Sequence, residues 1–314
     1  LISNPVHYRD TRTDGMQEEA AKIIPDRAFY ESTGIQFMKL NTVYQLMSMG
    51  RTQPELLELA DKLLFMPDLF NYYLTGEKLC EYSIASTSQM MDARKKDWDR
   101  ALLQKLGINV GLLGDIVPSG TLAGSLSKQM CQGTGLKDVQ VIAVGGHDTA
   151  SAVLAVPAMK EHFAYISSGT WSLLGTECPD PVINDTTFGL NYTNEGGFGG
   201  RIRLLKNIMG LWILQESKRQ WELETGPVPF DLLDAEAEKA QPFYAFIDPD
   251  DGLFYEPGDM PSRIQQYCKN TGQRIPETKG QITRCIMESL AMKYRYAFTA
   301  LEEIRGVEFD SLHI

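Results

Sequence analysis

A histidine and an aspartate stand side by side in VQVIAVGGHDTASAV, the stretch that runs from residue 139 to residue 153. Two glycines precede this pair and allow unusual backbone angles and the close approach of a ligand. Two interpretations stay open from the residues alone. Either Asp148 caps the helix that follows and His147 is an ordinary turn residue, or Asp148 presents a carboxylate at the carboxyl end of a parallel strand, where open α/β sheets bind ligands.

A second candidate is the stretch SSGTWSLLG, residues 167–175, in which small hydroxyl residues and a glycine separate two apolar segments. A turn of this composition can expose backbone N–H groups, which favour phosphate oxygens. An ordinary hairpin turn is the alternative. The chain has neither a GxxxxGK[ST] loop nor a GxGxxG motif, so any nucleotide site here belongs to another type.

The glycine-rich stretch TNEGGFGGRIRLLKN, residues 193–207, leads into a segment with helical spacing. We predict a long helix over residues 206–224. Asn207 is then placed to cap that helix or to point at a ligand from its N-terminus. Gln215 follows two turns later and is expected close to the same face. The spacing does not separate the capping role from the binding role.

Charged residues crowd together in YRDTRTDG, residues 8–15, where Arg9, Asp10 and Arg12 follow one another closely. Alternating donors and acceptors of this kind suit a ligand with many hydroxyl groups. A solvated charge cluster is the alternative interpretation.

The elements that must position these residues follow from hydrophobic periodicity. Helical spacing predicts helices over 54–65 and within 276–306, the second ending at Gly306. The β-branched run 139–144 predicts a strand that is buried on both faces, and 162–177 predicts two strands around a tight turn. Strands that alternate with long helices indicate an α/β fold.

Size and composition limit the function. A length of 314 residues predicts two domains, and a net charge of −11 argues against nucleic acid or an anionic membrane as partner. Five cysteines without a CxxC pair predict free thiols in a reducing, cytoplasmic compartment. No apolar stretch is long enough for a membrane span. The chain lacks an initiator Met and ends within a predicted strand, so we expect it to be cut from a longer protein.

Taken together, these stretches resemble the FGGY carbohydrate kinases. The resemblance rests on YRDTRTDG, LLFMPDLFNYYLTGE, GGHDTASAV, SSGTWSLLGTE, TNEGG and RLLKNIMGLWILQ, which occur in the family's order along the chain. NTVYQL and KNIMGLWILQ point, within the family, to members that act on L-rhamnulose. The resemblance implies two actin-like, ribonuclease H-like α/β domains with mixed sheets flanked by helices, closing over a cleft. Residues 1–155 would belong to a sugar-binding domain and residues 156–314 to a nucleotide-binding domain.

The resemblance also implies a reaction, the transfer of a phosphoryl group from ATP, with Mg²⁺, to the 1-hydroxyl of L-rhamnulose. It assigns the general base to Asp148 and sugar contacts to His147, Thr149 and Asn207. Nucleotide contacts fall to Thr170 and Gln215. Two alternatives stay open: a kinase for another ketose, such as L-fuculose or a xylulose-type sugar, and a sugar-binding module without catalysis.

The sequence departs from the family's pattern at both ends. The Asp-Gly phosphate loop that helps to hold Mg²⁺ does not occur near the start, and the glycine-rich adenosine motif does not follow the final LHI. We therefore expect both domains to be incomplete, and we assign no metal ligand within this chain.

Overall fold

The computed structural model describes residues 1–314, and these residues form two compact units. Unit 1 consists of residues 1–163 and 176–205, and unit 2 consists of residues 164–175 and 206–314. The chain thus passes first into unit 2 after Phe163 and leaves it again for residues 176–205. The boundary between residues 155 and 156 stays a prediction.

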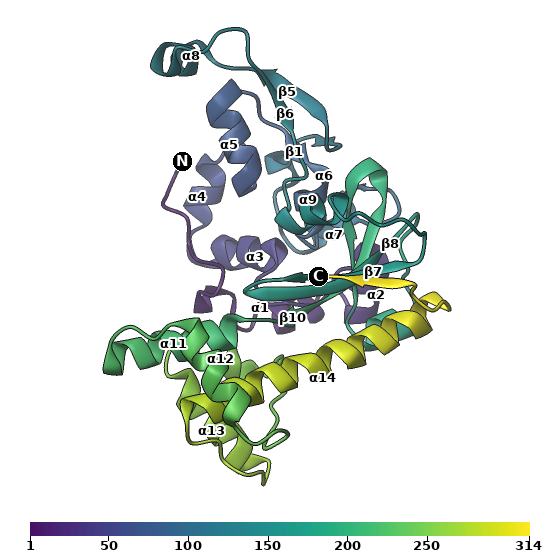
Figure 1. The fold of residues 1–314 in the computed structure, drawn as a ribbon. Coiled ribbons are helices and arrows are strands. Elements are labelled where there is room, and N and C mark those ends of the chain that lie inside the picture. Colours follow the sequence, from purple (N-terminus) through teal and green to yellow (C-terminus); the bar gives the residue numbers. More distant parts are fainter. The chain divides into compact units, whose positions relative to one another are not determined.

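Most of the regular secondary structure of unit 1 is helical (Figure 1). The α-helices are α1 (Met16–Ala21), α2 (Asp26–Thr33), α3 (Thr42–Thr52), α4 (Pro54–Leu59), α5 (Met66–Thr75), α6 (Tyr82–Ser86), α7 (Arg100–Lys105), α8 (Lys128–Thr134), α9 (Asp148–Leu154) and α10 (Asp185–Gly189). Short 3₁₀ turns lie at η1 (Thr11–Thr13), η2 (Val110–Leu112) and η3 (Phe198–Gly200). The helix predicted over 54–65 ends six residues early, at Leu59. The chain turns extended at Ala60, and the backbone N–H of Leu63 donates to the carbonyl of Leu112 (2.8 Å) instead of continuing the helix.

The strands of unit 1 form small pairs. Strand β1 (Cys80–Glu81) pairs parallel with β4 (Ile116–Val117), and β2 (Met91–Asp92) pairs antiparallel with β3 (Asp97–Trp98). Strand β5 (Thr121–Ser125) pairs antiparallel with β6 (Gln140–Ala143). The antiparallel pair β9 (Thr193–Gly196) with β10 (Ile202–Met209) differs from these, because it forms the edge of a five-stranded sheet.

The strand predicted over 139–144 forms, but its predicted environment is wrong. It is β6, its one partner is the antiparallel β5, and only Ala143 is buried. Ile142 is 44% exposed and Val144 65% exposed. A β-branched apolar run therefore predicted the strand correctly, whereas the number of faces that neighbours cover depends on tertiary packing.

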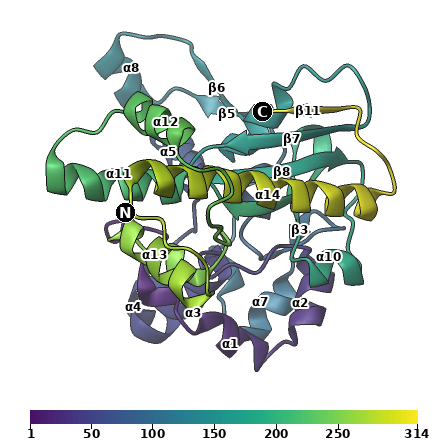
Figure 2. The same cartoon turned by 60° about the horizontal axis from the view of Figure 1, so that its bottom comes forward.

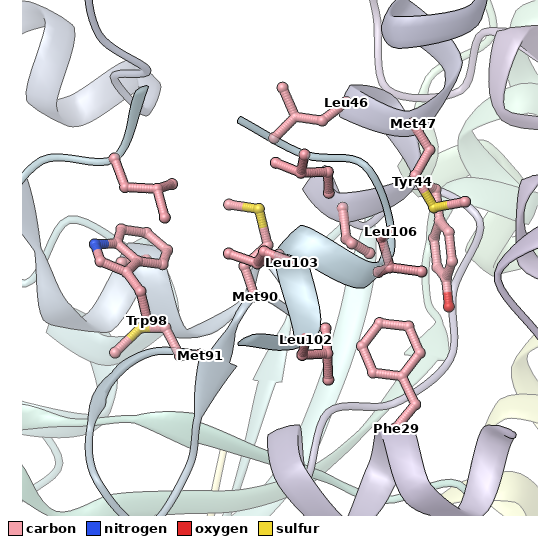
Figure 3. Packing of buried hydrophobic residues seen from close by; sticks show 14 of the residues in the cluster. Phe29, Tyr44, Leu46, Met47, Met90, Met91, Trp98, Leu102, Leu103 and Leu106 are labelled. Carbon is pink, nitrogen blue, oxygen red and sulfur yellow. The ribbon is translucent and has the colours of Figure 1, made fainter. Parts of the chain in front are cut away.

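The core of unit 1 gathers side chains from helices that are far apart in the sequence (Figure 3). Phe29, Tyr44, Met90 and Leu103 are at most 1% exposed. Trp98 packs into the same cluster and satisfies its indole N–H by donating to the carbonyl of Gly114 at 2.7 Å.

Unit 2 combines a sheet with four α-helices (Figures 1 and 2). The helices are α11 (Trp212–Thr225), α12 (Phe230–Lys239), α13 (Met260–Asn270) and α14 (Lys279–Arg305), with the 3₁₀ turn η4 (Gly252–Phe254) between α12 and α13. Its strands follow the order β11 (Ser311–His313), β7 (Phe163–Ser168), β8 (Trp171–Cys178) and then β10. The predicted hairpin over 162–177 is confirmed as the antiparallel pair β7 and β8.

The long helix predicted within 276–306 is confirmed as α14. A capping box formed by Thr278 and Gln281 begins it, and Gly306 ends it in the left-handed region (φ 65°). Ile286 and Leu290 of α14 pack in one core with Ile213, Phe254 and Ile264. No helix in either unit combines the length and the apolar character that a membrane crossing needs.

Candidate functional site

Asp148 is the first residue of α9, and its side chain is 96% exposed. The residue at the N-cap is His147, whose backbone is extended and whose carbonyl accepts from the N–H groups of Ala150 and Ser151. The prediction that Asp148 is the N-cap is therefore wrong by one residue. Its Oδ1 accepts instead from the N–H of Thr149 at 2.7 Å. A negative charge in the first helical turn is stabilised by the helix dipole, while the carboxylate stays accessible to solvent.

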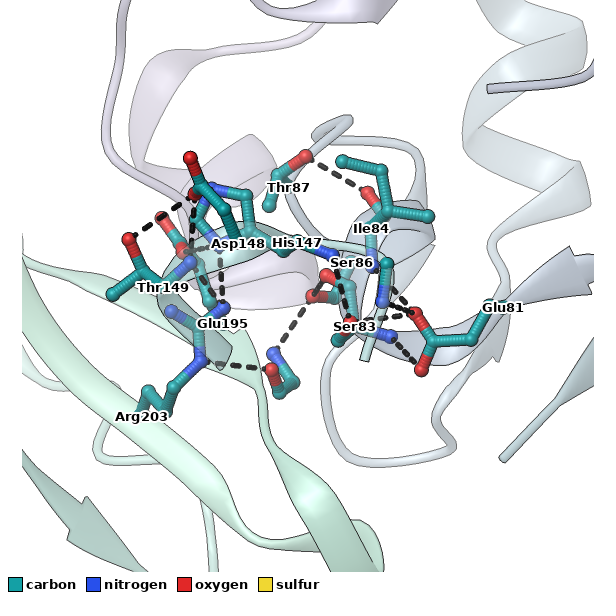
Figure 4. Close-up of polar contacts among 12 residues, drawn as sticks. Glu81, Ser83, Ile84, Ser86, Thr87, His147, Asp148, Thr149, Glu195 and Arg203 are labelled. Atoms are coloured by element: carbon teal, nitrogen blue, oxygen red, sulfur yellow. Dashed lines mark hydrogen bonds and ion pairs between the residues drawn. The ribbon is translucent and has the colours of Figure 1, made fainter. Parts of the chain in front are cut away.

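Thr149 lies beside this carboxylate but is buried (Figure 4). The residue is 4% exposed, and its Oγ1 lies 3.4 Å from Oδ1 of Asp148. The predicted site residues His147, Asp148 and Thr149 therefore lie together at the start of one helix. They differ in exposure: Asp148 is exposed, Thr149 is buried, and the His147 side chain is 21% exposed.

A buried ion pair holds the imidazole ring of His147. Arg203 of β10 is fully buried, and Glu195 of β9 is its cross-strand partner. Nη2 of Arg203 lies 3.1 Å from Oε2 of Glu195 and 3.0 Å from Nδ1 of His147 (Figure 4). The Nε–H of Arg203 donates to the carbonyl of Gly196 at 3.0 Å. Burial is the main cause that lowers the pKa of His147; Glu195 acts in the opposite direction.

A second buried carboxylate holds the backbone of the same loop. Oε2 of Glu81 accepts from the N–H of Gly146 (2.9 Å) and from the hydroxyl of Ser83 (2.5 Å), and that hydroxyl oxygen accepts from the N–H of His147 (3.2 Å). Oε1 of Glu81 accepts from the hydroxyl of Ser119 (2.5 Å). A Cβ at position 146 would lie 3.1 Å from Oε2 of Glu81 and would crowd this carboxylate. Ring and backbone of His147 are thus fixed independently.

Sequence reasoning missed Glu81, Ser83, Glu195 and Arg203. In sequence, the stretches TNEGG and RIRLL are distinguished by their glycines and their apolar residues. A usable signal was present: Glu195 and Arg203 are opposite charges that flank a glycine-rich turn within apolar strands, which indicates a cross-strand pair. Nothing in the local pattern links Glu81 to a loop 65 residues away.

In unit 2, Thr170 occupies the turn between β7 and β8, and Gln215 lies in the first turn of α11. The hydroxyl of Thr170 donates to Oε1 of Gln215 at 3.3 Å, so the structure brings these two predicted nucleotide contacts together. Thr170 is half-buried and Gln215 is exposed.

The turn that carries Thr170 offers its carbonyls to the neighbouring loop, and the predicted nest of N–H groups stays a prediction. The carbonyl of Thr170 accepts from the N–H groups of Gly210 (3.1 Å) and Trp212 (3.2 Å), and that of Gly169 accepts from Leu211 (2.9 Å). These bonds satisfy the donors that precede α11. They leave no room for a side chain at position 210, where a Cβ would lie 2.7 Å from the carbonyl oxygen of Gly169.

Asn207 does not cap a helix. The segment predicted to begin a helix at residue 206 continues strand β10 to Met209, and α11 begins only at Trp212, with Leu211 at its N-cap. The physical reason is the sheet, since β10 lies beside β8. Asn207 is half-buried in unit 2.

The charged stretch at residues 8–15 has local structural roles in unit 1. Asp10 caps η1 by accepting from the N–H of Arg12 at 2.9 Å, and Nη2 of Arg12 donates to Gln45 at 2.8 Å. Arg9 is 4% exposed. The structure has no group of three or more His, Cys, Asp or Glu side chains that could hold a metal ion, and the five cysteines are free.

Comparison with known proteins identifies the family. Residues 1–155 match the N-terminal domain, and residues 164–314 the C-terminal domain, of the FGGY family of carbohydrate kinases. A curated rhamnulokinase of Bacteroides thetaiotaomicron is 44% identical over all 314 residues, which span 64% of that protein. A rhamnulokinase of Oceanobacillus iheyensis is 41% identical over the same residues, which span 65% of it. The chain thus covers just under two thirds of these relatives.

Solved structures show the same fold. The xylulose kinase of Lactobacillus acidophilus superposes with a TM-score of 0.75 at 16% identity, over 100% of this chain and 63% of that one. A structure described as a xyloylose kinase of Brucella ovis gives a TM-score of 0.73 at 20% identity, over 100% of this chain and 63% of that one. The predicted α/β class and two-domain, actin-like kinase fold are confirmed.

Proposed function

We propose that this chain, which belongs to the FGGY family of carbohydrate kinases, acts in an ATP-dependent kinase that phosphorylates the 1-hydroxyl of L-rhamnulose. The identity of 41–44% to rhamnulokinases along the whole chain supports the substrate. The observation that supports the proposed chemistry is the position of the Asp148 carboxylate, which is 96% exposed. The loop that precedes it is held by hydrogen bonds to the buried side chains of Glu81 and Arg203.

In the proposed reaction Asp148 is the general base. A sugar hydroxyl is a weak nucleophile, and a carboxylate that accepts its proton late in the transfer assists the attack. His147 and Thr149 would bind neighbouring hydroxyls, and a site built from such polar groups discriminates strongly against sugars that leave them unpaired. A fixed loop also reduces the entropic cost of aligning the reacting hydroxyl.

Thr170 and Gln215 are our candidates for contacts to ATP, which supplies the phosphoryl group when bound. Their mutual hydrogen bond of 3.3 Å and their partial exposure support this assignment. Asn207 stays a candidate sugar contact. We assign no residue of this chain to Mg²⁺, which phosphate groups and water molecules hold in large part in such enzymes. The free cysteines and the use of ATP support a cytoplasmic location.

An ADP-release assay on the full-length gene product tests the proposed activity. We expect a higher kcat/KM with L-rhamnulose than with L-fuculose or xylulose. A higher value with another ketose would overturn the proposed substrate. Absence of ADP release with all three, together with calorimetric binding of sugar but not of MgATP, would overturn the kinase and indicate a sugar-binding module.

The variant Asp148→Asn tests the base. It should lower kcat by about 10²- to 10⁴-fold, the usual contribution of general base catalysis, and leave the fold intact. Asp185→Asn is the matched control, since Asp185 is also the first residue of a short helix in unit 1 and its side chain is also 96% exposed. That control should keep full turnover. Full turnover in Asp148→Asn would remove Asp148 from the mechanism.

A further inference from the structure

The buried pair of Glu195 and Arg203 is aimed at one group outside itself, the imidazole of His147. Arg203 is 0% exposed and Glu195 is 4% exposed, so neither can contact a ligand in solvent directly. Both contribute to the surroundings of Nδ1 of His147, at 3.0 Å from Nη2 of Arg203 and 3.7 Å from Oε2 of Glu195. A charged pair placed beneath a candidate sugar-binding side chain acts through that side chain.

We infer that Arg203, oriented by Glu195, is a positioning residue that fixes His147 as the neutral tautomer with its proton on Nε2. The substrate that this tautomer would meet, a sugar hydroxyl, rests on the proposed function. The tautomer itself does not, because it follows from the contacts within unit 1.

The two distances decide which nitrogen carries the proton. A guanidinium has only N–H donors, so at 3.0 Å Nδ1 of His147 must be the acceptor and hence unprotonated. Protonated Nδ1 would need an acceptor, and Oε2 of Glu195 lies beyond hydrogen-bond range at 3.7 Å. The proton of a neutral ring is then on Nε2, because the partner of one ring nitrogen sets the state of the other.

Four charged groups surround the ring, one each from β10, β9, α9 and β1: Arg203, Glu195, Asp148 and Glu81. Arg203 opposes a positive ring, and the three carboxylates favour one. Burial is the largest effect and lowers the pKa of His147, so the neutral form dominates at neutral pH.

The neutral ring matters for its neighbour. Nε2 of His147 lies 3.8 Å from Oδ1 of Asp148, too far for a direct hydrogen bond, and the carboxylate is one of the charges that act on the ring. An imidazolium at that distance would favour the ionised carboxylate and weaken it as a base. A neutral Nε2–H leaves Asp148 able to accept a proton and offers a donor to an adjacent hydroxyl. The Nε2–H donor of His147 and the carboxylate acceptor of Asp148 thus lie side by side, where they can bind two neighbouring hydroxyl groups of one sugar.

The test is ¹⁵N NMR of the imidazole in the full-length gene product labelled with ¹⁵N-histidine, titrated from pH 5 to pH 8 without sugar. His147→Gln assigns the signal. We expect Nδ1 of His147 to show the shift of an unprotonated nitrogen and Nε2 that of a protonated one. A proton on Nδ1 at neutral pH, or a doubly protonated ring, would overturn the inference without bearing on the kinase activity.

Arg203→Lys keeps a donor and a positive charge, whereas Arg203→Met removes both. We expect Arg203→Lys to retain the Nε2–H tautomer, and Arg203→Met to raise the pKa of His147 and mix the tautomers. Unchanged tautomer and pKa in Arg203→Met would overturn the inference. If that variant does not fold, the double variant Arg203→Met with Glu195→Gln replaces it. The second change removes the buried carboxylate that has lost its partner, and the tautomer of His147 is then compared in the same way.

Sugar affinity supplies the last readout. With L-rhamnulose as probe, Arg203→Met should bind the sugar about tenfold more weakly than the native protein, the size of effect expected for the loss of one hydrogen bond that involves a charged group. Arg203→Lys should keep most of the native affinity. Absence of sugar binding in the native protein would count against the proposed substrate. The NMR result would still decide the role of Arg203.

Discussion

The loop at residues 145–148 in unit 1 and the turn at residues 168–171 in unit 2 are both short, glycine-containing and predicted to carry site residues, yet different interactions hold them. Buried side-chain charges hold the first, through Glu81 on its backbone and Arg203 on its ring. Main-chain hydrogen bonds from residues 210–212 hold the second. The side-chain anchors need particular residues at distant positions, whereas the main-chain anchors need only space for the backbone.

The largest effect should come from removing the side-chain anchor with Glu81→Ala. The change leaves the N–H groups of Gly146, Ser83 and Ile84 without their acceptor. Each unpaired buried donor costs about 1–3 kcal/mol, and water in the new cavity offsets part of the sum. We expect a loss of about 3–5 kcal/mol in the free energy of unfolding, measured by urea denaturation.

Asp259→Ala is the matched control for this change. Asp259 also caps a helix and accepts from the N–H and hydroxyl of Ser262, but it is exposed. Its loss should cost about 1 kcal/mol, as for an ordinary cap. Equal costs for the two variants would mean that the buried network of Glu81 adds nothing to a helix cap.

An intermediate effect should come from crowding the main-chain anchor with Gly210→Ala. The new Cβ would lie 2.6 Å from Oγ of Ser172 and 2.7 Å from the carbonyl oxygen of Gly169, so the turn must shift. Overpacking of this kind costs about 1–3 kcal/mol, and we expect weaker ATP binding together with a lower Tm.

Gly252→Ala is the control in the same unit, because nothing lies within 4 Å of its added Cβ. That variant should stay within about 0.5 kcal/mol of the native protein. A Gly210→Ala variant as stable as Gly252→Ala would show that the turn does not depend on close backbone contact.

The smallest effect should be a pH dependence of the free energy of unfolding, which we expect from the loop in unit 1 and not from the turn in unit 2. Asp68, in the first turn of α5, is 0% exposed, accepts from the N–H of Glu81 and has an Oδ2 without a partner. Burial and, less strongly, the charge of Glu81 raise its pKa from 3.8 to about 7. The folded state therefore binds more protons than the unfolded state between about pH 4 and pH 7, and stability from this group falls as pH rises through that window.

Asp68→Asn should remove that dependence. Relative to the native protein, the variant should gain stability as pH rises from 5 to 8. The gain should be about 1 kcal/mol at pH 8, because the unpaired amide offsets part of the relief. Thermal unfolding at pH 5, 6.5 and 8 measures it. Parallel curves for native and variant protein would exclude Asp68 as the titrating group. The destabilisation by Gly210→Ala should not change with pH, since main-chain groups do not titrate.

Much of the framework follows from the sequence by itself. Helical periodicity and caps determine α14, and alternating apolar segments around a small-residue turn determine the β7–β8 hairpin. The adjacency of His147 and Asp148 at a strand-to-helix junction is also a local property, because neighbours in sequence stay neighbours in space. The order of the motifs is enough to indicate the family, which the comparisons confirm.

Tertiary structure alone decided the rest. Residues 206–209 have helical spacing but lie in a strand, because a sheet neighbour supplies hydrogen bonds that outweigh local preference. β6 is apolar yet half exposed, because burial depends on what packs against it. The anchors Glu81 and Arg203 lie 65 and 56 residues from the partners they hold, Gly146 and His147. Local periodicity cannot register contacts at such a separation, and these contacts determine how the catalytic candidates are oriented.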